Sequence, residues 1–172
     1  QLLESAITPK TKAFVFASPS NPTGLAYSRD ELQALAAVLK RHPSVQIISD
    51  DIYNHLMFGS CQVAPHLLEV APELKDRLLI VNGVSKSYSM TGWRIGWGVG
   101  PLSLIKCMAD YQSQSTSSAC SISQKAALAA IQHGDDDLMR ANKMLKQRLD
   151  EAFVLLEKIP LVRAIKPDGA FY

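Results

Sequence analysis

The stretch Val81-Asn-Gly-Val-Ser-Lys-Ser-Tyr-Ser-Met-Thr-Gly-Trp-Arg-Ile-Gly-Trp97 contains one lysine and one arginine in a setting typical of a cofactor site. Lys86 lies among small and hydroxyl-bearing residues just after an apolar segment, and Arg94 follows eight residues later. A lysine in a tight, partly apolar turn is a candidate nucleophile, because its neutral amine can attack a carbonyl. A nearby arginine suits a phosphate, since its planar guanidinium can donate two hydrogen bonds at once. The spacing therefore suggests a cofactor with a carbonyl and a phosphate, and pyridoxal phosphate (PLP) has both.

The composition of the chain is that of an ordinary folded domain. Of its 172 residues 47% are hydrophobic and 20% charged, which is normal for a globular protein. The net charge of +2 gives no reason to expect nucleic acid as a partner. No apolar run reaches the roughly 18 residues that a membrane span needs, so no membrane partner is expected. The three cysteines are widely spaced and fit a reducing cytoplasm, and the four histidines lack the spacing of a metal site.

Alternating strand and helix patterns predict an α/β fold with a mostly parallel sheet flanked by helices. Strands are expected at residues 13–17, 45–49, 78–81 and 95–99. A helix is expected over residues 29–40, where Ser28 and Glu31 form a capping box. The hydroxyl-rich run Tyr111–Ser118 is predicted to be a loop.

The C-terminal third has a different pattern. Residues from Ser123 onward are expected to be helical, Gly134 breaks the pattern, and a long amphipathic helix is predicted over residues 136–158, before Pro160. Residues 161–165 are predicted to form a further strand. We expect residues 1–134 to be part of one domain and residues 135–172 to lead into a second, with the chain truncated at both ends.

Polar side chains follow three of the predicted strands where each strand ends. Asn21 comes after the first, Asp50 after the second and Lys86 after the third. In open α/β sheets this carboxyl edge is where ligands bind. Each residue alone has an ordinary structural explanation, such as a turn for Asn21, a helix cap for Asp50 or a surface position for Lys86.

Three ordered motifs together resemble the fold-type I PLP enzymes, in particular the class I/II aminotransferases of the bacterial aspartate aminotransferase type. The motifs are Ser18-Pro-Ser-Asn-Pro-Thr-Gly24, Ser49-Asp-Asp-Ile-Tyr53 and Ser85-Lys-Ser-Tyr-Ser-Met-Thr-Gly-Trp-Arg-Ile-Gly96. The resemblance runs through almost the whole chain and includes Gly169-Ala-Phe-Tyr172. It implies an incomplete PLP-binding large domain of fold-type I, followed by the start of a small α+β domain.

The resemblance also implies roles for individual residues. Lys86 matches the lysine that forms the internal aldimine and then moves a proton. Asp50 matches the carboxylate that pairs with the pyridine nitrogen and keeps it protonated. Tyr53 and Asn21 match the two donors to the cofactor's phenolic oxygen, and Arg94 matches the phosphate ligand.

Two further positions have less definite implications. Ser85 either contacts the phosphate or only supports the turn. The family usually has Asp-Glu where this chain has Asp50-Asp51, and we expect little functional effect from that difference. The resemblance also implies a cis bond between Asn21 and Pro22.

The implied reaction is ping-pong transfer of an amino group from an aspartate-like or aromatic amino acid to a 2-oxo acid, in a homodimer. The family's glycine-rich phosphate loop and its arginine for the substrate carboxylate have no counterpart in these 172 residues. The chain alone is therefore expected to be inactive.

Alternatives are a lyase, decarboxylase or cyclase on the same fold, a non-catalytic PLP-sensing domain of a regulator, or a generic nucleotide-binding domain. The last leaves the spacing of Lys86 and Arg94 unexplained, and Gly96–Gly100 lacks the spacing of a dinucleotide-binding loop.

Overall fold

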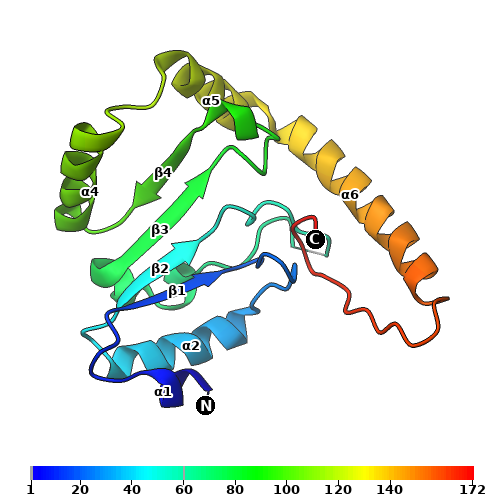
Figure 1. Ribbon diagram of the computed structural model, residues 1–172, viewed down its shortest axis with the longest axis horizontal. Helices are drawn as coiled ribbons and strands as arrows, with labels where there is room; N and C mark the ends of the chain where they lie inside the picture. The colour runs from blue at the N-terminus through cyan, green and yellow to red at the C-terminus, as the bar shows by residue number, and fades with distance from the viewer. Residues whose placement is uncertain (1, 60) are drawn as a thin grey trace.

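The computed structural model describes residues 2–59 and 61–172 and shows a four-stranded sheet with helices around it (Figure 1). The strands, adjacent in chain order, are β1 (Ala13–Ala17), β2 (Gln46–Asp50), β3 (Leu78–Gly83) and β4 (Gly96–Val99). Strands β1, β2 and β3 are parallel, and β4 runs antiparallel to β3. The predicted α/β fold with a mostly parallel sheet is therefore confirmed.

Helices and single helical turns connect and follow these strands. They are α1 (Leu2–Ala6), α2 (Arg29–Arg41), α3 (Leu67–Val70), α4 (Leu102–Ser115), α5 (Ser121–His133) and α6 (Asp135–Leu156), with 3-10 turns η1 (Pro72–Arg77) and η2 (Thr91–Trp93). Within the ranges that the structure describes, no helix is both long and apolar enough to cross a membrane.

The main core lies between one face of the sheet and the layer formed by α2, α3 and η1. Its fully or nearly fully buried members are Leu32, Ala36, Leu39, Ile47, Leu67, Ala71, Leu74 and Leu78. Ile47 pairs in register with Phe14 and Leu78, so these side chains share the covered face. Because side chains alternate along a strand, Ser49 lies on the same face as Ile47 and Asp50 lies on the opposite one.

Helix α2 begins with the capping box that its sequence predicts, and a distant arginine contacts its other end. Ser28 Oγ accepts the N–H of Glu31 at 3.3 Å, and a Glu31 carboxylate oxygen accepts the N–H of Ser28 at 2.8 Å. At the other end, Arg77 donates to the carbonyls of Leu39 and Val45, each at 2.6 Å. These bonds satisfy backbone groups that a helix end leaves without partners, and they fix α2 against the sheet.

The predicted strand over residues 161–165 is wrong. These residues lie outside every helix and strand, and Leu161 is fully exposed with a positive φ of 68°. An apolar β-branched run forms a strand only where a neighbouring strand takes up its backbone hydrogen bonds. None of the described strands runs beside this segment.

The prediction of a loop over residues 111–118 is also wrong in its first part, because α4 continues to Ser115. Ser113 donates to the carbonyl of Asp110 at 2.7 Å and Ser115 to that of Tyr111 at 3.0 Å. Serine hydroxyls that bond back to carbonyls three or four residues earlier can remain inside a helix. Thr116 caps the C-terminal end of the helix, and Ser117 has a positive φ of 63°.

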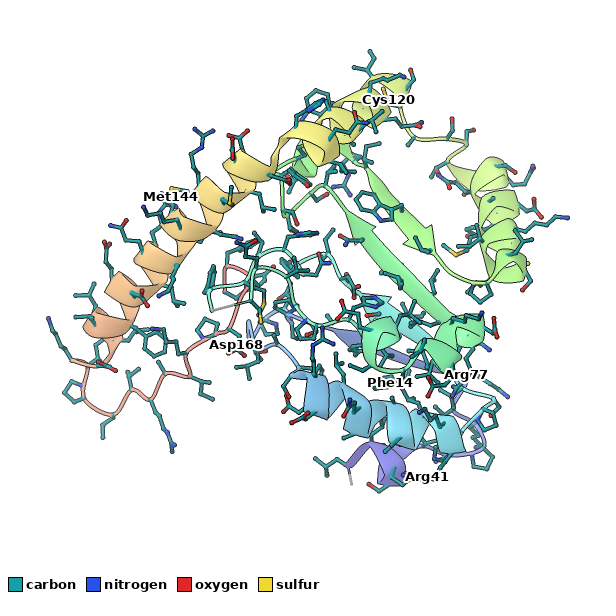
Figure 2. All side chains as sticks on the ribbon, turned by 180° about the vertical axis from the view of Figure 1, so that it is seen from behind. Phe14, Arg41, Arg77, Cys120, Met144 and Asp168 are labelled. Atoms are coloured by element: carbon teal, nitrogen blue, oxygen red, sulfur yellow. The ribbon has the colours of Figure 1, made fainter. Side chains whose placement is uncertain are left out.

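After α6 the chain returns to the carboxyl ends of the strands (Figure 1). The N–H groups of Asp168 and Gly169 donate to the carbonyl of Gly24 at 3.0 and 2.9 Å, and Ala170 donates to Leu56 at 2.8 Å. Figure 2 labels Asp168 on this returning segment. The Asp168 carboxylate accepts the N–H of Ala26 at 3.0 Å. The last residues of the chain therefore lie beside the predicted site.

Candidate active site

The loops that follow β1, β2 and β3 meet at one edge of the sheet. Ala17 pairs in register with Asp50, and Asp50 with Val81, so the carboxyl ends of the three parallel strands lie at one edge, with β3 continuing to Gly83. Asn21 follows the end of β1, Asp50 closes β2, and Lys86 follows the end of β3. The structure thus brings the three predicted residues to the same edge. The bond between Asn21 and Pro22 is cis, as the resemblance implies.

A phenol hydroxyl from the end of the chain is the centre of the polar cluster at this edge. The Tyr53 Oη lies 2.7 Å from the Tyr172 Oη. Asn21 Nδ2 also donates to the Tyr172 Oη, at 2.9 Å. Tyr53 is buried, whereas Tyr172 is partly exposed. The hydrogen bond with Tyr53, helped by desolvation, raises the pKa of Tyr172 above its usual value. Asn21 and Tyr53 therefore converge on an aromatic oxygen.

The Lys86 side chain lies against the aromatic residues of this cluster. Its Nζ is 5.8 Å from the ring centroid of Tyr53 and 5.5 Å from that of Phe171. At these distances the rings attract the ammonium group through their negative faces. Lys86 and Tyr53 are thus neighbours, as the predicted site requires.

Asp50 is half-buried at the end of β2. Its Oδ1 accepts the N–H of Ile52 at 3.2 Å, while its Oδ2 has no hydrogen-bond partner among the described residues. Asp50 and Asn21 both line a hollow of about 770 Å³ that runs along β1. One carboxylate oxygen is therefore anchored and the other is available to a donor.

Within the described ranges, no hydrogen bond joins Arg94 or Ser85 to Asn21, Tyr53 or Tyr172. Arg94 is exposed, has left-handed backbone angles of φ 55° and ψ 46°, and donates from Nη1 to the Thr91 carbonyl at 2.9 Å. Ser85 is half-buried, and within the described ranges its hydroxyl makes no hydrogen bond. The turn from Lys86 to Arg94 begins at the site, and the Arg94 guanidinium makes its hydrogen bond within that turn, to Thr91.

Asp51, directly after Asp50, is buried and contacts His66, one of the four histidines whose spacing does not suggest a metal site. Ser49 Oγ donates to Asp51 Oδ1 at 2.6 Å, and His66 Nε2 lies 2.8 Å from Asp51 Oδ2. The two atoms are within ion-pair distance, although their geometry is not that of a well-aligned hydrogen bond. Asp51 raises the pKa of His66, and burial opposes this change.

Sequence reasoning assigned no role to Tyr172, Phe171 or His66. The first two lie in the quoted motif Gly169–Tyr172, which was a usable signal, but their contact with Tyr53 depends on the return of the chain after α6. Nothing in the local sequence links His66 to Asp51. Among residues 2–59 and 61–172, no three His, Cys, Asp or Glu side chains gather as a metal-binding group.

A comparison with known protein families identifies the family of this chain. The family model described as "Aminotransferase class I and II" matches residues 1–172. This chain belongs to that family. The chain is 50% identical over 173 aligned residues to a probable aspartate/prephenate aminotransferase of Rickettsia bellii, covering all of this chain and 43% of the relative. It is also 50% identical to the aspartate/prephenate aminotransferase of Cereibacter sphaeroides, over 99% of this chain and 42% of the relative.

Solved structures of the family share the fold. The crystal structure of the aspartate aminotransferase from Rhizobium meliloti matches with a TM-score of 0.94 and 43% identity, over 98% of this chain and 42% of that chain. The aspartate aminotransferase from Thermus thermophilus with maleate matches with a TM-score of 0.86 and 37% identity, over 98% and 43%. The chain thus spans less than half the length of these relatives, and the fold-type I assignment is confirmed.

Proposed function

We propose that the protein containing this chain is a PLP-dependent aminotransferase that moves an amino group from an amino acid to a 2-oxo acid. The observation that carries the proposal is the meeting of Asn21, Asp50, Tyr53 and Lys86 at one sheet edge, in a chain of the class I and II family. Relatives are named for aspartate and prephenate. We therefore propose an aspartate-like or aromatic amino acid as substrate.

The residues at the sheet edge fit PLP. The cofactor is a hydroxypyridine, and Asn21 Nδ2 and Tyr53 Oη already meet on an aromatic hydroxyl oxygen, that of Tyr172. Asp50 has a carboxylate oxygen available for a protonated ring nitrogen. Lys86 supplies the amine for the aldehyde group. These are four groups of the right chemical type within one small region.

Each side chain has a distinct proposed task. When bound, PLP supplies an electron sink for the bond that breaks at the substrate Cα. Asp50 holds a proton on the ring nitrogen, because an adjacent carboxylate favours the protonated form. Lys86 binds the cofactor through Nζ and, once released, carries a proton away from the substrate Cα. Asn21 and Tyr53 orient the ring by donating to its phenolic oxygen.

Arg94 and Ser85 are proposed on the phosphate side. Arg94 is the proposed phosphate ligand, and to reach an anion its guanidinium must leave the Thr91 carbonyl. A charged hydrogen bond to phosphate is stronger than a bond to a neutral carbonyl, which favours that exchange. Ser85 precedes Lys86 and, with a hydroxyl free of other partners in the described ranges, is available as a second phosphate donor.

The larger context of the site is also proposed. Gly134 alone separates α5 from α6, which supports a boundary between a large-domain part (residues 1–134) and an interdomain helix leading to a small domain (residues 135–172). The family resemblance supports a homodimer, and the exposed, unpaired cysteines are compatible with the cytoplasm.

The test is an absorbance titration of the natural protein containing this sequence with PLP, followed by aspartate. We expect a visible band that depends on Lys86 and gives way to the spectrum of the aminated cofactor. Lys86→Ala should abolish the band, whereas Lys106→Ala on the exposed face of α4 should leave it unchanged. A normal band that no amino acid alters would favour the regulator alternative. Pyruvate and ammonia from a β-substituted amino acid would favour the lyase.

A further inference from the structure

Asp51 is a buried carboxylate that is held at both of its oxygens. Its side chain is only 7% exposed. Ser49 Oγ donates to Oδ1 at 2.6 Å, and His66 Nε2 lies 2.8 Å from Oδ2. Burial of a carboxylate is costly unless such partners compensate for the lost water. Ser49 and His66 therefore determine whether Asp51 stays in this position.

The backbone of Asp51 lies at the start of the turn that carries the site. Its N–H donates to the carbonyl of Val81 in β3 at 2.9 Å, and its own carbonyl accepts the N–H of Asn54 at 2.9 Å. Asp50 precedes this anchored residue and Tyr53 lies inside the turn that it closes. A shift of Asp51 would therefore move both proposed cofactor contacts.

His66 reaches Asp51 from a different part of the chain and uses its two nitrogens for different tasks. Nδ1 accepts the N–H of Leu68 at 3.0 Å and thereby caps α3. Because Nδ1 is an acceptor in that bond, the proton of neutral His66 lies on Nε2, the nitrogen beside Asp51. The neighbouring Glu69 is occupied by Arg29 at 2.5 Å, so Asp51 is the carboxylate that His66 contacts directly.

We propose that His66 and Ser49 are positioning residues for the PLP site: they hold Asp51 so that Asp50 and Tyr53 keep their orientation toward the cofactor. The inference rests on the proposed function. It also gives Asp51 a role, because its buried carboxylate, between Ser49 and His66, anchors the turn that carries Asp50 and Tyr53. His66 itself contacts neither substrate nor cofactor in this arrangement.

Two substitutions of His66 separate its two nitrogens. His66→Asn keeps an acceptor near the position of Nδ1, where it can still cap α3, but has no group that reaches Asp51. His66→Gln places an amide N–H near the position of Nε2 but loses the cap. We expect His66→Asn to raise the dissociation constant for PLP about tenfold, and His66→Gln to change it less than about threefold.

The second readout is the pH midpoint at which the absorption of the lysine-bound cofactor changes. If Asp50 is held loosely, it stabilises the protonated ring nitrogen of the cofactor less well. When the ring nitrogen loses its positive charge, there is less repulsion against a proton on the Lys86 nitrogen, so that nitrogen is protonated more easily. The midpoint should therefore rise in His66→Asn and stay in place in His66→Gln. A loss of stability alone would not move this midpoint.

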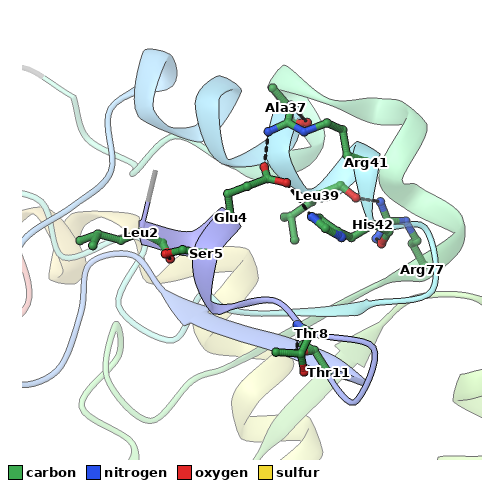
Figure 3. Close-up of polar contacts among 10 residues, drawn as sticks. All are labelled: Leu2, Glu4, Ser5, Thr8, Thr11, Ala37, Leu39, Arg41, His42 and Arg77. Carbon is green, nitrogen blue, oxygen red and sulfur yellow. Dashed lines mark hydrogen bonds and ion pairs between the residues drawn. The ribbon is translucent and has the colours of Figure 1, made fainter.

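The matched control is His42→Asn. His42, the residue after α2, contacts Glu4 of α1 at 2.9 Å in the same kind of histidine–carboxylate pair (Figure 3). It comes just before β2, and therefore lies at the amino ends of the parallel strands. Its substitution should alter neither cofactor readout. Ser49→Ala removes the other contact of Asp51 and should also raise the dissociation constant for PLP. If His66→Asn does not fold, this variant tests whether Asp51 positions the site.

The outcomes separate the inference from the proposed function. A wild-type protein without a lysine-dependent band would overturn the proposed function, and the inference with it. A normal wild-type band, with equal dissociation constants and midpoints in wild type and His66→Asn, would overturn the inference alone. Equal weakening by the Asn and Gln variants would also overturn it, since the cap and not Asp51 would then be responsible.

Discussion

Tyr53 and Tyr172 lie with their hydroxyl oxygens 2.7 Å apart and their rings nearly perpendicular, at 74°. They are 119 residues apart in sequence, and Asn21 donates to the same Tyr172 oxygen. The end of the chain therefore occupies the point at which two proposed cofactor ligands converge. If PLP binds there, its phenolic oxygen has to replace that of Tyr172.

This competition predicts that Tyr172→Phe binds PLP more tightly. Removing the hydroxyl leaves Asn21 and Tyr53 without a partner that the cofactor must displace. One hydrogen bond contributes about 1 kcal/mol, so the dissociation constant should fall about fivefold. An absorbance titration measures it. Tyr27→Phe is the control, because the Tyr27 ring packs on Phe16 and, among the described residues, its hydroxyl is not a partner of Asn21 or Tyr53. An unchanged or higher constant in Tyr172→Phe would show that Tyr172 does not compete with the cofactor.

The position of Arg94 predicts a selective loss of phosphate recognition. Arg94→Gly removes the guanidinium at a residue with left-handed backbone angles, which glycine adopts without strain. Affinity for PLP should fall about tenfold to a hundredfold, as expected for one charged hydrogen bond, while affinity for pyridoxal without phosphate changes little. Titrations with both compounds measure the ratio.

Ser89→Gly provides a matched control for this change. Ser89 lies in the same turn and also has a positive φ, 54°, but its side chain has no charge. It should leave the preference for the phosphorylated compound intact. If both glycine variants lose that preference equally, the conformation of the turn and not the guanidinium is responsible.

The close packing around Gly169 leads to a prediction about the stability of the protein. An added Cβ would lie 2.2 Å from the carbonyl oxygen of Leu56 and 2.8 Å from Pro19. Gly169→Ala should therefore force the backbone apart and lower the free energy of unfolding by about 1–3 kcal/mol. Urea unfolding followed by circular dichroism measures the change. Gly59→Ala, where a Cβ meets nothing within 4 Å, should have a much smaller effect, and equal losses would contradict this account.

The parts of the structure that could be predicted from the sequence depend on local patterns. The capping box of Ser28 and Glu31, the strand before Asn21 and the strand ending near Asp50 all have signals within a few residues. Parallel strands then bring their carboxyl ends together, so the meeting of Asn21, Asp50 and Lys86 follows from topology.

The parts that could not be predicted depend on the path of the chain in space. The contact between Tyr172 and Asn21 spans 151 residues and forms only because the chain turns back after α6. His66 contacts Asp51 because α3 packs against α2. The spacing of apolar residues within either helix does not predict this packing. The strand predicted near Leu161 does not form for a related reason. A strand needs a neighbouring strand for its backbone hydrogen bonds, and the sequence of the segment does not show whether one lies beside it.

The pH dependence of stability follows from the contacts of Glu4, which connects α1 to the end of α2 (Figure 3). Hydrogen bonds from Arg41, and then from His42 at 2.9 Å, lower the pKa of Glu4 below its ordinary value of 4.5. A lowered folded-state pKa means that this stabilisation is present above pH 4.5 and is lost as the pH falls through the folded-state value. Glu4→Gln should therefore be less stable than wild type at pH 7, and the difference should shrink in acid. Urea midpoints of both proteins from pH 7 to pH 3 measure it, with Glu157→Gln as control. A constant difference across this range would exclude the carboxylate charge as the cause.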